Sequence, residues 1–223
     1  MTNHLVLSQL QFGYGAKCIL DGISQALPLG KMVAICGLNG AGKSSFFKIL
    51  AGLENHYTGE ITLNKIPLRT INIKDRAKHI AFVTTDRPRL RGLDVRTLLE
   101  LGAHDRIPPH QLTDHLNHVL KVTQTSHLAD HSLMHLSDGE MQKVMMARAL
   151  AQNTSLIIAD EPTAFLDYQA KKDMMKLMAQ LAHQQGKLIL FSSHDLELTK
   201  EFADIRFELA NGKLKEIPFD HLI

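Results

Sequence analysis

Residues 37–44 read Gly37-Leu38-Asn39-Gly40-Ala41-Gly42-Lys43-Ser44 and fit the phosphate-binding loop pattern G-x-x-x-x-G-K-S/T. In such a loop the glycines let backbone N–H groups point inward around the phosphates of a nucleotide. Lys43 is expected to reach the β- and γ-phosphates, and the Ser44 hydroxyl is expected to ligate Mg²⁺. The residues predicted to surround the phosphates are Gly37, Asn39, Gly40, Ala41, Gly42, Lys43, Ser44 and Ser45. This stretch therefore predicts a site for a nucleoside triphosphate.

The residues on both sides of the loop argue against a chance match. Before it, Met32-Val33-Ala34-Ile35-Cys36 is a short apolar run typical of a buried parallel strand. After it, apolar residues repeat at helical spacing from Phe46 to Ala51, and Gly52 supplies a C-terminal stop. The order strand, loop, helix is the one that presents the positive end of a helix dipole to phosphates.

Composition limits the class of protein. The chain has 223 residues, of which 44% are hydrophobic, so it is long enough for one compound domain with a sizeable core. A formal charge of +2 and a pI near 8.5 are too mild to predict nucleic acid or an anionic membrane surface as the main partner.

The two cysteines predict a reducing, cytoplasmic compartment. Cys18 and Cys36 have no metal-ligand spacing, and a disulfide at Cys36 would obstruct the phosphate loop. The amino terminus lacks the pattern of a signal peptide, and no uncharged apolar run approaches membrane-spanning length. Any role at a membrane is therefore expected to depend on a partner.

The rest of the chain predicts an α/β fold with two additions. Residues 5–29 alternate apolar stretches with turn residues and predict antiparallel strands, and residues 58–63 and 80–83 predict further strands. Between residues 93 and 136 the pattern becomes helical, with Leu98, Leu99 and Leu101 among the repeating apolar residues. We expect one domain, with a nucleotide-binding core over residues 1–85 and 141–223 and an inserted helical subdomain over residues 86–140.

Tyr14 and the histidines each allow two interpretations. Tyr14 can stack on adenine or fill the packed face of a strand. Two histidine pairs, His115/His118 and His131/His135, have the spacing of metal ligands on one helix face. No cysteine accompanies them, so we interpret them as solvated or core-edge side chains.

A second apolar run ends in the chemistry that complements the phosphate loop. Leu156-Ile157-Ile158-Ala159-Asp160-Glu161 is a predicted buried strand that ends in two carboxylates. Asp160 is expected to hold Mg²⁺ through its water shell, and Glu161 to polarise the water that attacks the γ-phosphate. The alternative is a plain Asp-Glu-Pro turn that begins a helix. His194 follows another predicted strand, and the carboxyl ends of such strands meet at one crevice.

In this order and spacing, the motifs resemble those of ABC-type ATPase subunits over almost the whole chain. The resemblance rests on residues 37–44, Leu136-Ser137-Asp138-Gly139-Glu140, the strand that ends at Glu161, Ala164-Phe165-Leu166-Asp167 and His194. It implies the P-loop NTPase fold, ATP hydrolysis with Mg²⁺, and a head-to-tail homodimer that sandwiches ATP. It also implies that Ser137 and Gly139 contact the γ-phosphate bound to the other copy, that Asp167 links the two sites, and that Tyr14 stacks on adenine.

A softer likeness concerns the cargo. Phe12-Gly13-Tyr14-Gly15, Leu20-Asp21-Gly22-Ile23-Ser24 and Leu93-Asp94-Val95 are similar to segments of ATPases that drive uptake of ferric siderophores, haem and cobalamin. This implies a polytopic membrane permease as partner, a substrate-binding protein acting indirectly, and a position on the cytoplasmic face of the membrane. Arg87, Arg89 and Arg91 lie where such subunits meet the permease, or form a solvated basic loop.

The chain departs from the family pattern at four positions. Thr85 stands where a glutamine that serves Mg²⁺ and the attacking water is usual, and we expect its hydroxyl to act there. In the family signature, which is Leu136 to Glu140 here, Asp138 and Glu140 stand where glycine and glutamine are usual. Ala164 replaces a usual serine. Read by itself, Ser137-Asp138-Gly139-Glu140 is an S-x-x-E capping box that begins a helix.

Other functions remain open at this point. A non-transport ABC ATPase that acts on ribosomes or DNA usually carries two cassettes or a long coiled coil, and neither is present. A module that binds ATP without turnover is disfavoured by Glu161 and His194. A subunit for another cargo, an exporter or a lipoprotein-release system stays possible, because the ATPase subunit does not touch the cargo.

Overall fold

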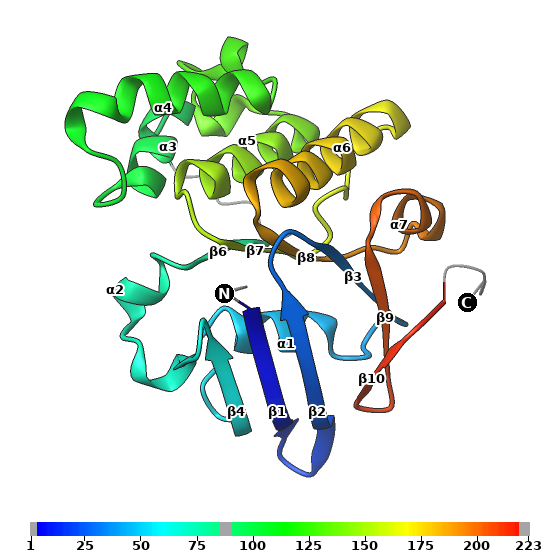
Figure 1. Ribbon diagram of the computed structural model, residues 1–223. Coiled ribbons are helices and arrows are strands. Elements are labelled where there is room, and N and C mark those ends of the chain that lie inside the picture. Colours follow the sequence, from blue (N-terminus) through cyan, green and yellow to red (C-terminus); the bar gives the residue numbers. More distant parts are fainter. Residues whose placement is uncertain (1–3, 85–90, 219–223) are drawn as a thin grey trace.

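The computed structural model describes residues 4–84 and 91–218, and it contains two β-sheets with helices around them (Figure 1). The antiparallel sheet has the order β2-β1-β4-β5 and consists of β1 (His4–Tyr14), β2 (Lys17–Pro28), β4 (Thr58–Leu63) and β5 (Ile66–Pro67). In β1, Leu5 and Leu7 are buried and Ser8 is exposed, as expected for a sheet with one covered face. The antiparallel strands predicted for residues 5–29 and the strand at 58–63 are confirmed.

The second sheet has the order β10-β9-β3-β8-β7-β6. Its strands are β3 (Met32–Cys36), β6 (Ile80–Val83), β7 (Leu156–Ala159), β8 (Leu188–Ser192), β9 (Ile205–Ala210) and β10 (Lys213–Glu216). All neighbours pair in parallel except β10, which pairs antiparallel with β9. Every residue of β3, β7 and β8 is buried, which is why these strands read as continuous apolar runs. Because they are adjacent and parallel, their carboxyl ends lie side by side.

Helix α1 (Lys43–Leu50) lies between the two sheets (Figure 1). Its Phe46 and Phe47 are fully buried in a core that also contains Leu5 of β1 and Leu190 of β8. Burial of each large apolar side chain contributes about 1.5–3 kcal/mol. The start of α1 is therefore held firmly against the ends of the central strands.

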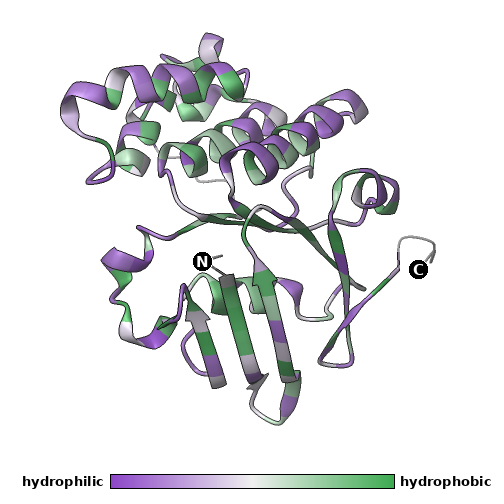
Figure 2. Cartoon of the chain, viewed as in Figure 1, coloured by the Kyte–Doolittle hydropathy of each residue, from purple (hydrophilic) through white to green (hydrophobic). Residues whose placement is uncertain are grey.

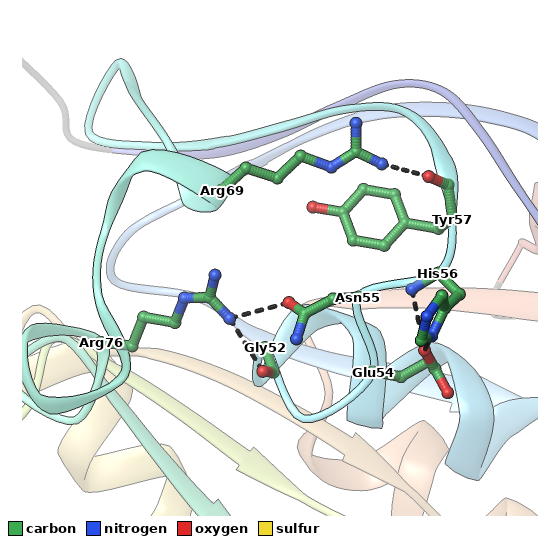
Figure 3. A network of polar contacts seen from close by, with 7 residues as sticks. All are labelled: Gly52, Glu54, Asn55, His56, Tyr57, Arg69 and Arg76. Carbon is green, nitrogen blue, oxygen red and sulfur yellow. Dashed lines mark hydrogen bonds and ion pairs between the residues drawn. The ribbon is translucent and has the colours of Figure 1, made fainter.

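A polar network fixes the loop that follows α1 (Figure 3). Arg76 Nη1 donates hydrogen bonds to the Gly52 carbonyl at 2.8 Å and to Asn55 Oδ1 at 3.0 Å. The Arg69 guanidinium lies 4.2 Å from the centre of the Tyr57 ring and donates to the Tyr57 carbonyl. Gly52 has φ 72°, a conformation that favours glycine, and a Cβ there would also displace the Arg76 side chain from its hydrogen bonds.

Most of the remaining helices form a second layer on the other side of the parallel sheet, whereas the two short helices between β5 and β6 lie outside this layer (Figure 1). The longer ones are α3 (Val95–Ala103), α4 (Pro109–Val122), α5 (Asp138–Ala151) and α6 (Tyr168–Gln185). The short ones are η1 (Leu68–Thr70), α2 (Ile73–Arg76), η2 (Ser126–Leu128), η3 (Leu133–His135) and α7 (Leu196–Phe202). Helices α3, α4 and α5 share a core with α6 and the sheet. The boundary proposed between residues 140 and 141 falls inside the first turn of α5.

The architecture confirms the predicted fold class, an α/β core with an antiparallel β part and a helical insertion. Hydrophobic residues follow β1, β2 and the central strands, whereas hydrophilic residues face outward on the helical layer (Figure 2). Within residues 4–84 and 91–218, none of the helices combines the length and the apolar character needed to cross a membrane.

Candidate nucleotide-binding site

Two glycines of the phosphate loop hold conformations that a side chain would block. Gly37 has φ 141°, and a Cβ there would lie 2.5 Å from the carbonyl oxygen of Leu209 in β9. Gly42 has φ 104°, and a Cβ there would lie 2.5 Å from Cγ2 of Ile19 in β2. The loop therefore threads between β2 and β9, and glycine is required by close approach as well as by the positive φ.

The first turn of α1 carries no side-chain cap. Its N-cap residue is Gly42, and the turn Lys43-Ser44-Ser45 contains no acidic residue. The first N–H groups of a helix have no partner inside the helix, so they are available to an anion. Lys43 is buried, and its Nζ donates to the carbonyl oxygens of Gly37 at 2.7 Å and Leu38 at 3.2 Å. A phosphate oxygen at this helix end would compete with these two carbonyls for the ammonium group.

A pocket of about 340 Å³ opens at this helix end. It joins three segments that are far apart in the sequence, and its lining residues are Tyr14, Lys17, Ile19, Asn39, Gly40, Gly42, Lys43, Ser44, Ser45 and Glu161. Lys17 was not anticipated from the sequence. The feature that indicates its place in the pocket is the β1–β2 register, which places Lys17 opposite Tyr14.

Tyr14 does not fill the packed face of β1. Tyr14 is 58% exposed, and its ring forms a T-shaped pair with the Phe12 ring at 4.8 Å between ring centres. The alternative in which Tyr14 is a core residue is therefore wrong, and the ring is available at the rim of the pocket.

Asp160 and Glu161 follow β7, and one hydroxyl group contacts both. Ser192 Oγ, at the end of β8, donates to Asp160 Oδ1 at 2.6 Å and accepts a hydrogen bond from the Glu161 N–H at 2.9 Å. Glu161 has φ 50°, which is uncommon for a residue with a side chain. Sequence reasoning gave Ser192 no role, because only the pairing of β7 with β8 brings it to the two acids.

The structure brings His194 and Glu161 together. His194 Nε2 lies 2.7 Å from Glu161 Oε1, and the two side chains are 47% and 35% exposed. Glu161 also lines the pocket that contains Lys43. A carboxylate and an imidazole thus lie beside the phosphate loop, where groups that activate water are needed.

The donor atoms expected to bind Mg²⁺ are available. Within residues 4–84 and 91–218, neither Asp160 Oδ2 nor the Ser44 hydroxyl takes part in a hydrogen bond or an ion pair. Carboxylate and hydroxyl oxygens are the ligands that Mg²⁺ prefers. The residues present therefore fit this ion.

Helix α5 begins with the capping box that the sequence predicted. Ser137 is the N-cap, and the Glu140 N–H donates to Ser137 Oγ at 3.3 Å. Glu140 Oε2 accepts from the Ser137 hydroxyl at 2.7 Å and from the Ser137 N–H at 2.8 Å. These two hydrogen bonds lower the pKa of the Glu140 carboxyl from its ordinary value. The carboxylate of Glu140 is thus turned back onto its own helix end.

Residues 164–167 pack beside this helix end. A Cβ on Gly139 would lie 3.4 Å from Leu166 Cδ2 and 3.5 Å from the Phe165 carbonyl oxygen, so the two segments touch. Asp167 is the N-cap of α6 and accepts a hydrogen bond from the Ala170 N–H at 2.8 Å. Ser137, Gly139 and Asp167 are not among the residues that line the pocket at Lys43.

Comparison with known proteins identifies the family. The sequence model of the "ABC transporter" family matches residues 20–164. The chain is also 32% identical over 219 residues to the iron(3+)-hydroxamate import ATP-binding protein FhuC of Bacillus subtilis, covering 94% of this chain and 80% of that protein. The chain belongs to the ABC transporter ATP-binding subunits. Members of this family bind and hydrolyse ATP.

Other relatives of this ABC subunit differ in cargo. It is 32% identical to the achromobactin transport ATP-binding protein CbrD of Dickeya dadantii, over 88% of this chain and 75% of that protein. It is 28% identical to the sulfate/thiosulfate import ATP-binding protein CysA of Escherichia coli, over 94% of this chain and 58% of that protein.

Solved structures agree with the fold. An ATP-binding subunit of an ABC transporter superposes with a TM-score of 0.88 at 27% identity, over 97% of this chain and 90% of that chain. A dimeric cassette in a post-hydrolysis state, bound to ADP and phosphate, superposes with a TM-score of 0.86 at 24% identity, over 98% of this chain and 100% of that chain.

Two groups of residues named from the sequence do not contribute described contacts to the pocket at Lys43. Thr85, Arg87 and Arg89 lie outside the described residues. His115 Nε2 lies 3.0 Å from the Ala151 carbonyl oxygen, which ties α4 to the end of α5.

The ABC subunit also carries a groove between α2 and the helical layer. Two pockets of about 590 Å³ and 310 Å³ adjoin there and share Ala77, Arg148 and Gln152. Leu53, Ile73 and Leu101 line them and are 58%, 70% and 58% exposed. Leu101, which helical spacing groups with Leu98 and Leu99, therefore faces the groove and not the core. We call this surface, defined by the lining of the two pockets, the α2 groove.

Proposed function

We propose that this chain is the ATP-hydrolysing subunit of an ABC importer and that its nucleotide lies in the pocket at Lys43. The observation that supports this most directly is the lining of that pocket. An exposed tyrosine, the phosphate loop and a carboxylate paired with a histidine come from separate segments and meet there. These three groups match the three parts of the reaction, because a nucleotide needs contacts for its base, for its phosphates and for the attacking water.

Each group in the pocket has a distinct role in this proposal. Tyr14 stacks on adenine, and the backbone N–H groups from Asn39 to Ser45 together with Lys43 neutralise the β- and γ-phosphates. Glu161 orients a water molecule toward the γ-phosphorus and accepts its proton as the bond to the leaving oxygen breaks. His194 holds the Glu161 carboxylate through the contact at 2.7 Å and faces the γ-phosphate. Ser44 and Asp160 would hold Mg²⁺, with Thr85 as a further ligand predicted from the sequence, and the ion would supply further charge neutralisation at the phosphate oxygens.

We further propose that two copies sandwich ATP head to tail. Ser137 and Gly139 lie apart from the pocket of their own chain, and the dimeric cassette with ADP and phosphate shares the fold. In the dimer they reach the γ-phosphate bound to the other copy, and Asp167 connects the two sites. The signature of this chain thus completes the site of its partner.

Replacement of Glu161 tests the sandwich dimer. In Glu161→Gln, the water loses its proton acceptor while the phosphate contacts remain, so ATP is expected to accumulate in a closed dimer. Light scattering with Mg-ATP is the measurement, and the matched control is Glu197→Gln, which removes an acid in the first turn of α7. A monomer under these conditions would contradict the head-to-tail dimer.

The proposed partner is a polytopic permease, which places the subunit on the cytoplasmic face of the membrane. The α2 groove is the candidate contact surface, because it combines exposed apolar side chains with cations. Arg148 lines both of its pockets and has no ion pair within residues 4–84 and 91–218, and burial lowers its pKa. Three apolar side chains around a desolvated guanidinium suit an amphipathic helix with an acidic side chain.

For the cargo, we propose an iron complex such as a ferric siderophore, with haem and cobalamin as related candidates, delivered by a substrate-binding protein. The support is the likeness to FhuC and CbrD, whereas CysA is named for sulfate and thiosulfate import. Uptake of radiolabelled ferric hydroxamate, haem, cobalamin and sulfate is to be compared in cells whose sole copy of the gene is wild type or Lys43→Ala. Loss of iron-complex uptake alone supports the proposal, and loss of sulfate uptake alone overturns the cargo assignment.

A further inference from the structure

Ser192 occupies the junction of three elements that build the ATP site. It ends β8, which lies between β3 and β7 in the parallel sheet. In the β3–β8 register it pairs with Ile35, two residues before the phosphate loop, and the β7–β8 register ends at Ala159, directly before Asp160. The side chain is fully buried. This hydroxyl group is therefore built into the sheet beneath the site.

The single hydroxyl proton of Ser192 determines the direction of both of its hydrogen bonds. A serine hydroxyl has one proton to donate, and an ionised carboxylate can only accept. At 2.6 Å the proton of Ser192 therefore goes to Asp160 Oδ1, and the Glu161 N–H donates to Ser192 Oγ at 2.9 Å. One buried atom thus ties the side chain of Asp160 to the backbone of Glu161.

These two contacts constrain the two acids in different ways. For Asp160, one carboxylate oxygen accepts the hydrogen bond from Ser192, which fixes the orientation of the group and leaves Oδ2 without a hydrogen bond among the described residues. For Glu161, the hydrogen bond holds the peptide group where the backbone takes φ 50°, a conformation that needs support from its surroundings. From that backbone the Glu161 side chain reaches His194 at 2.7 Å.

We propose that Ser192 is a positioning residue for ATP hydrolysis, which sets the Asp160 carboxylate for Mg²⁺ and the Glu161 backbone for the attacking water. This inference rests on the proposed roles of Asp160 and Glu161. It separates Ser192 from the adjacent Ser193, whose Oγ accepts a hydrogen bond from the Asp195 N–H at 3.0 Å, at the start of α7. Both serines are buried, but Ser192 alone bonds to the two acids.

The test compares Ser192→Ala with Ser193→Ala, which delete the same atom from neighbouring buried positions. A fluorescent ATP analogue is titrated in EDTA and over a range of Mg²⁺ concentrations, and kcat and KM are measured separately. Groups that orient metal ligands change metal affinity or activity by about 10–100-fold when they are removed. For Ser192→Ala we expect the Mg²⁺ concentration for half-maximal binding to rise about tenfold and kcat to fall about 10–100-fold, with unchanged nucleotide affinity in EDTA. Ser193→Ala is expected to change neither.

Thermal unfolding of both variants shows whether they fold, and Ser192→Cys serves if Ser192→Ala does not. Its thiol has a similar size but is a weak donor, so a smaller shift in the same direction is expected. A wild-type Mg²⁺ dependence in the folded Ser192 variant overturns the inference, as does an equal loss of affinity with and without Mg²⁺. A wild-type protein that fails to bind Mg-ATP overturns the proposed site itself and is recognised before any variant is compared.

Discussion

Helices α1 and α5 both begin at a loop that the family motifs associate with phosphate, yet their first turns are chemically opposite. Helix α1 follows Gly42 without a side-chain cap, and its first turn carries Lys43 and no acid. Helix α5 follows Ser137 with a complete capping box, and its first turn carries Asp138 and Glu140. The positive end of α1 is thus open to a ligand, whereas that of α5 is satisfied by its own chain.

The difference separates two ways in which one fold can treat a helix end. An uncapped turn leaves N–H groups that pair with water or with an external anion, so α1 is less stable by itself and is suited to bind phosphate. A capped turn with acids is more stable by itself and less attractive to an anion. We infer that most of the binding free energy for the phosphates of ATP comes from α1, and that α5 binds the nucleotide of the partner copy more weakly.

The largest expected effect comes from removing the cation of α1. Lys43→Ala takes away the ammonium group that contacts the Gly37 and Leu38 carbonyls and would face the β- and γ-phosphates. Loss of one preorganised charge-stabilising group lowers turnover by about 10²–10³-fold. Steady-state ATPase assays measure this, with Lys65→Ala, on the turn between β4 and β5, as control. Turnover within a few-fold of wild type would break the comparison, because α1 would then not depend on its cation.

A second substitution makes α1 resemble α5. Ser45 occupies the third position of α1, as Glu140 does in α5, so Ser45→Glu places an acid at the matching site. We expect ATP affinity to fall about tenfold or more through repulsion of the phosphates. The free energy of unfolding without nucleotide should stay equal or rise by about 0.3–1 kcal/mol. Isothermal titration and chemical unfolding measure the two, and Ser45→Gln is the neutral control. Unchanged affinity in Ser45→Glu would show that phosphate does not approach this turn.

The converse substitution makes the start of α5 resemble the usual signature. Asp138→Gly with Glu140→Gln removes both acids while glutamine can still complete a capping box. ATP-driven dimerisation should tighten a few-fold, and the free energy of unfolding should fall by about 0.5–1 kcal/mol through lost helix-end charge. The dimerisation is measured in the Glu161→Gln background by light scattering against ATP concentration. Weaker dimerisation in this variant would mean that the acids make a favourable contact in the dimer, contrary to our account of α5.

The smallest expected effect is the pH dependence of the α5 cap. The hydrogen bonds from the Ser137 hydroxyl and N–H lower the pKa of Glu140 in the folded state. Its contribution is therefore complete above the unfolded pKa of about 4.3 and is lost as the pH falls through the lower folded value. The difference in unfolding free energy between wild type and Glu140→Gln should be constant from neutral pH down to about 5 and shrink below about 4.3. Urea unfolding at several pH values measures it, and a difference that grows on acidification would contradict the sign.

Features that depend on near neighbours in the chain could be predicted from sequence. The capping box spans Ser137 to Glu140, and the phosphate loop joins a strand to the helix that directly follows it. Such contacts are local, so their spacing in the sequence carries their geometry. The antiparallel strands and helical insertion followed from periodicity for the same reason.

Features that depend on packing could not be predicted. Leu101 has the spacing of a core residue, but the α2 groove leaves it 58% exposed. Lys17 joins the nucleotide pocket only because the β1–β2 hairpin brings it beside the phosphate loop. Neither residue type signals such a position, since the same side chain occurs on any surface.

The sequence by itself predicted a phosphate-binding loop at residues 37–44, because glycine, lysine and serine at that spacing have few other uses, and the order of all its motifs resembles that of ABC-type ATPases. Tertiary structure alone decided how the two acids are held. Ser192 is separated from Asp160 and Glu161 by all of α6 and the preceding residues of β8, and strand pairing places its hydroxyl oxygen 2.6 Å from the Asp160 carboxylate and 2.9 Å from the Glu161 amide nitrogen. The physical reason is that a hydrogen bond depends on distances of a fraction of an ångström, which only the packed sheet defines.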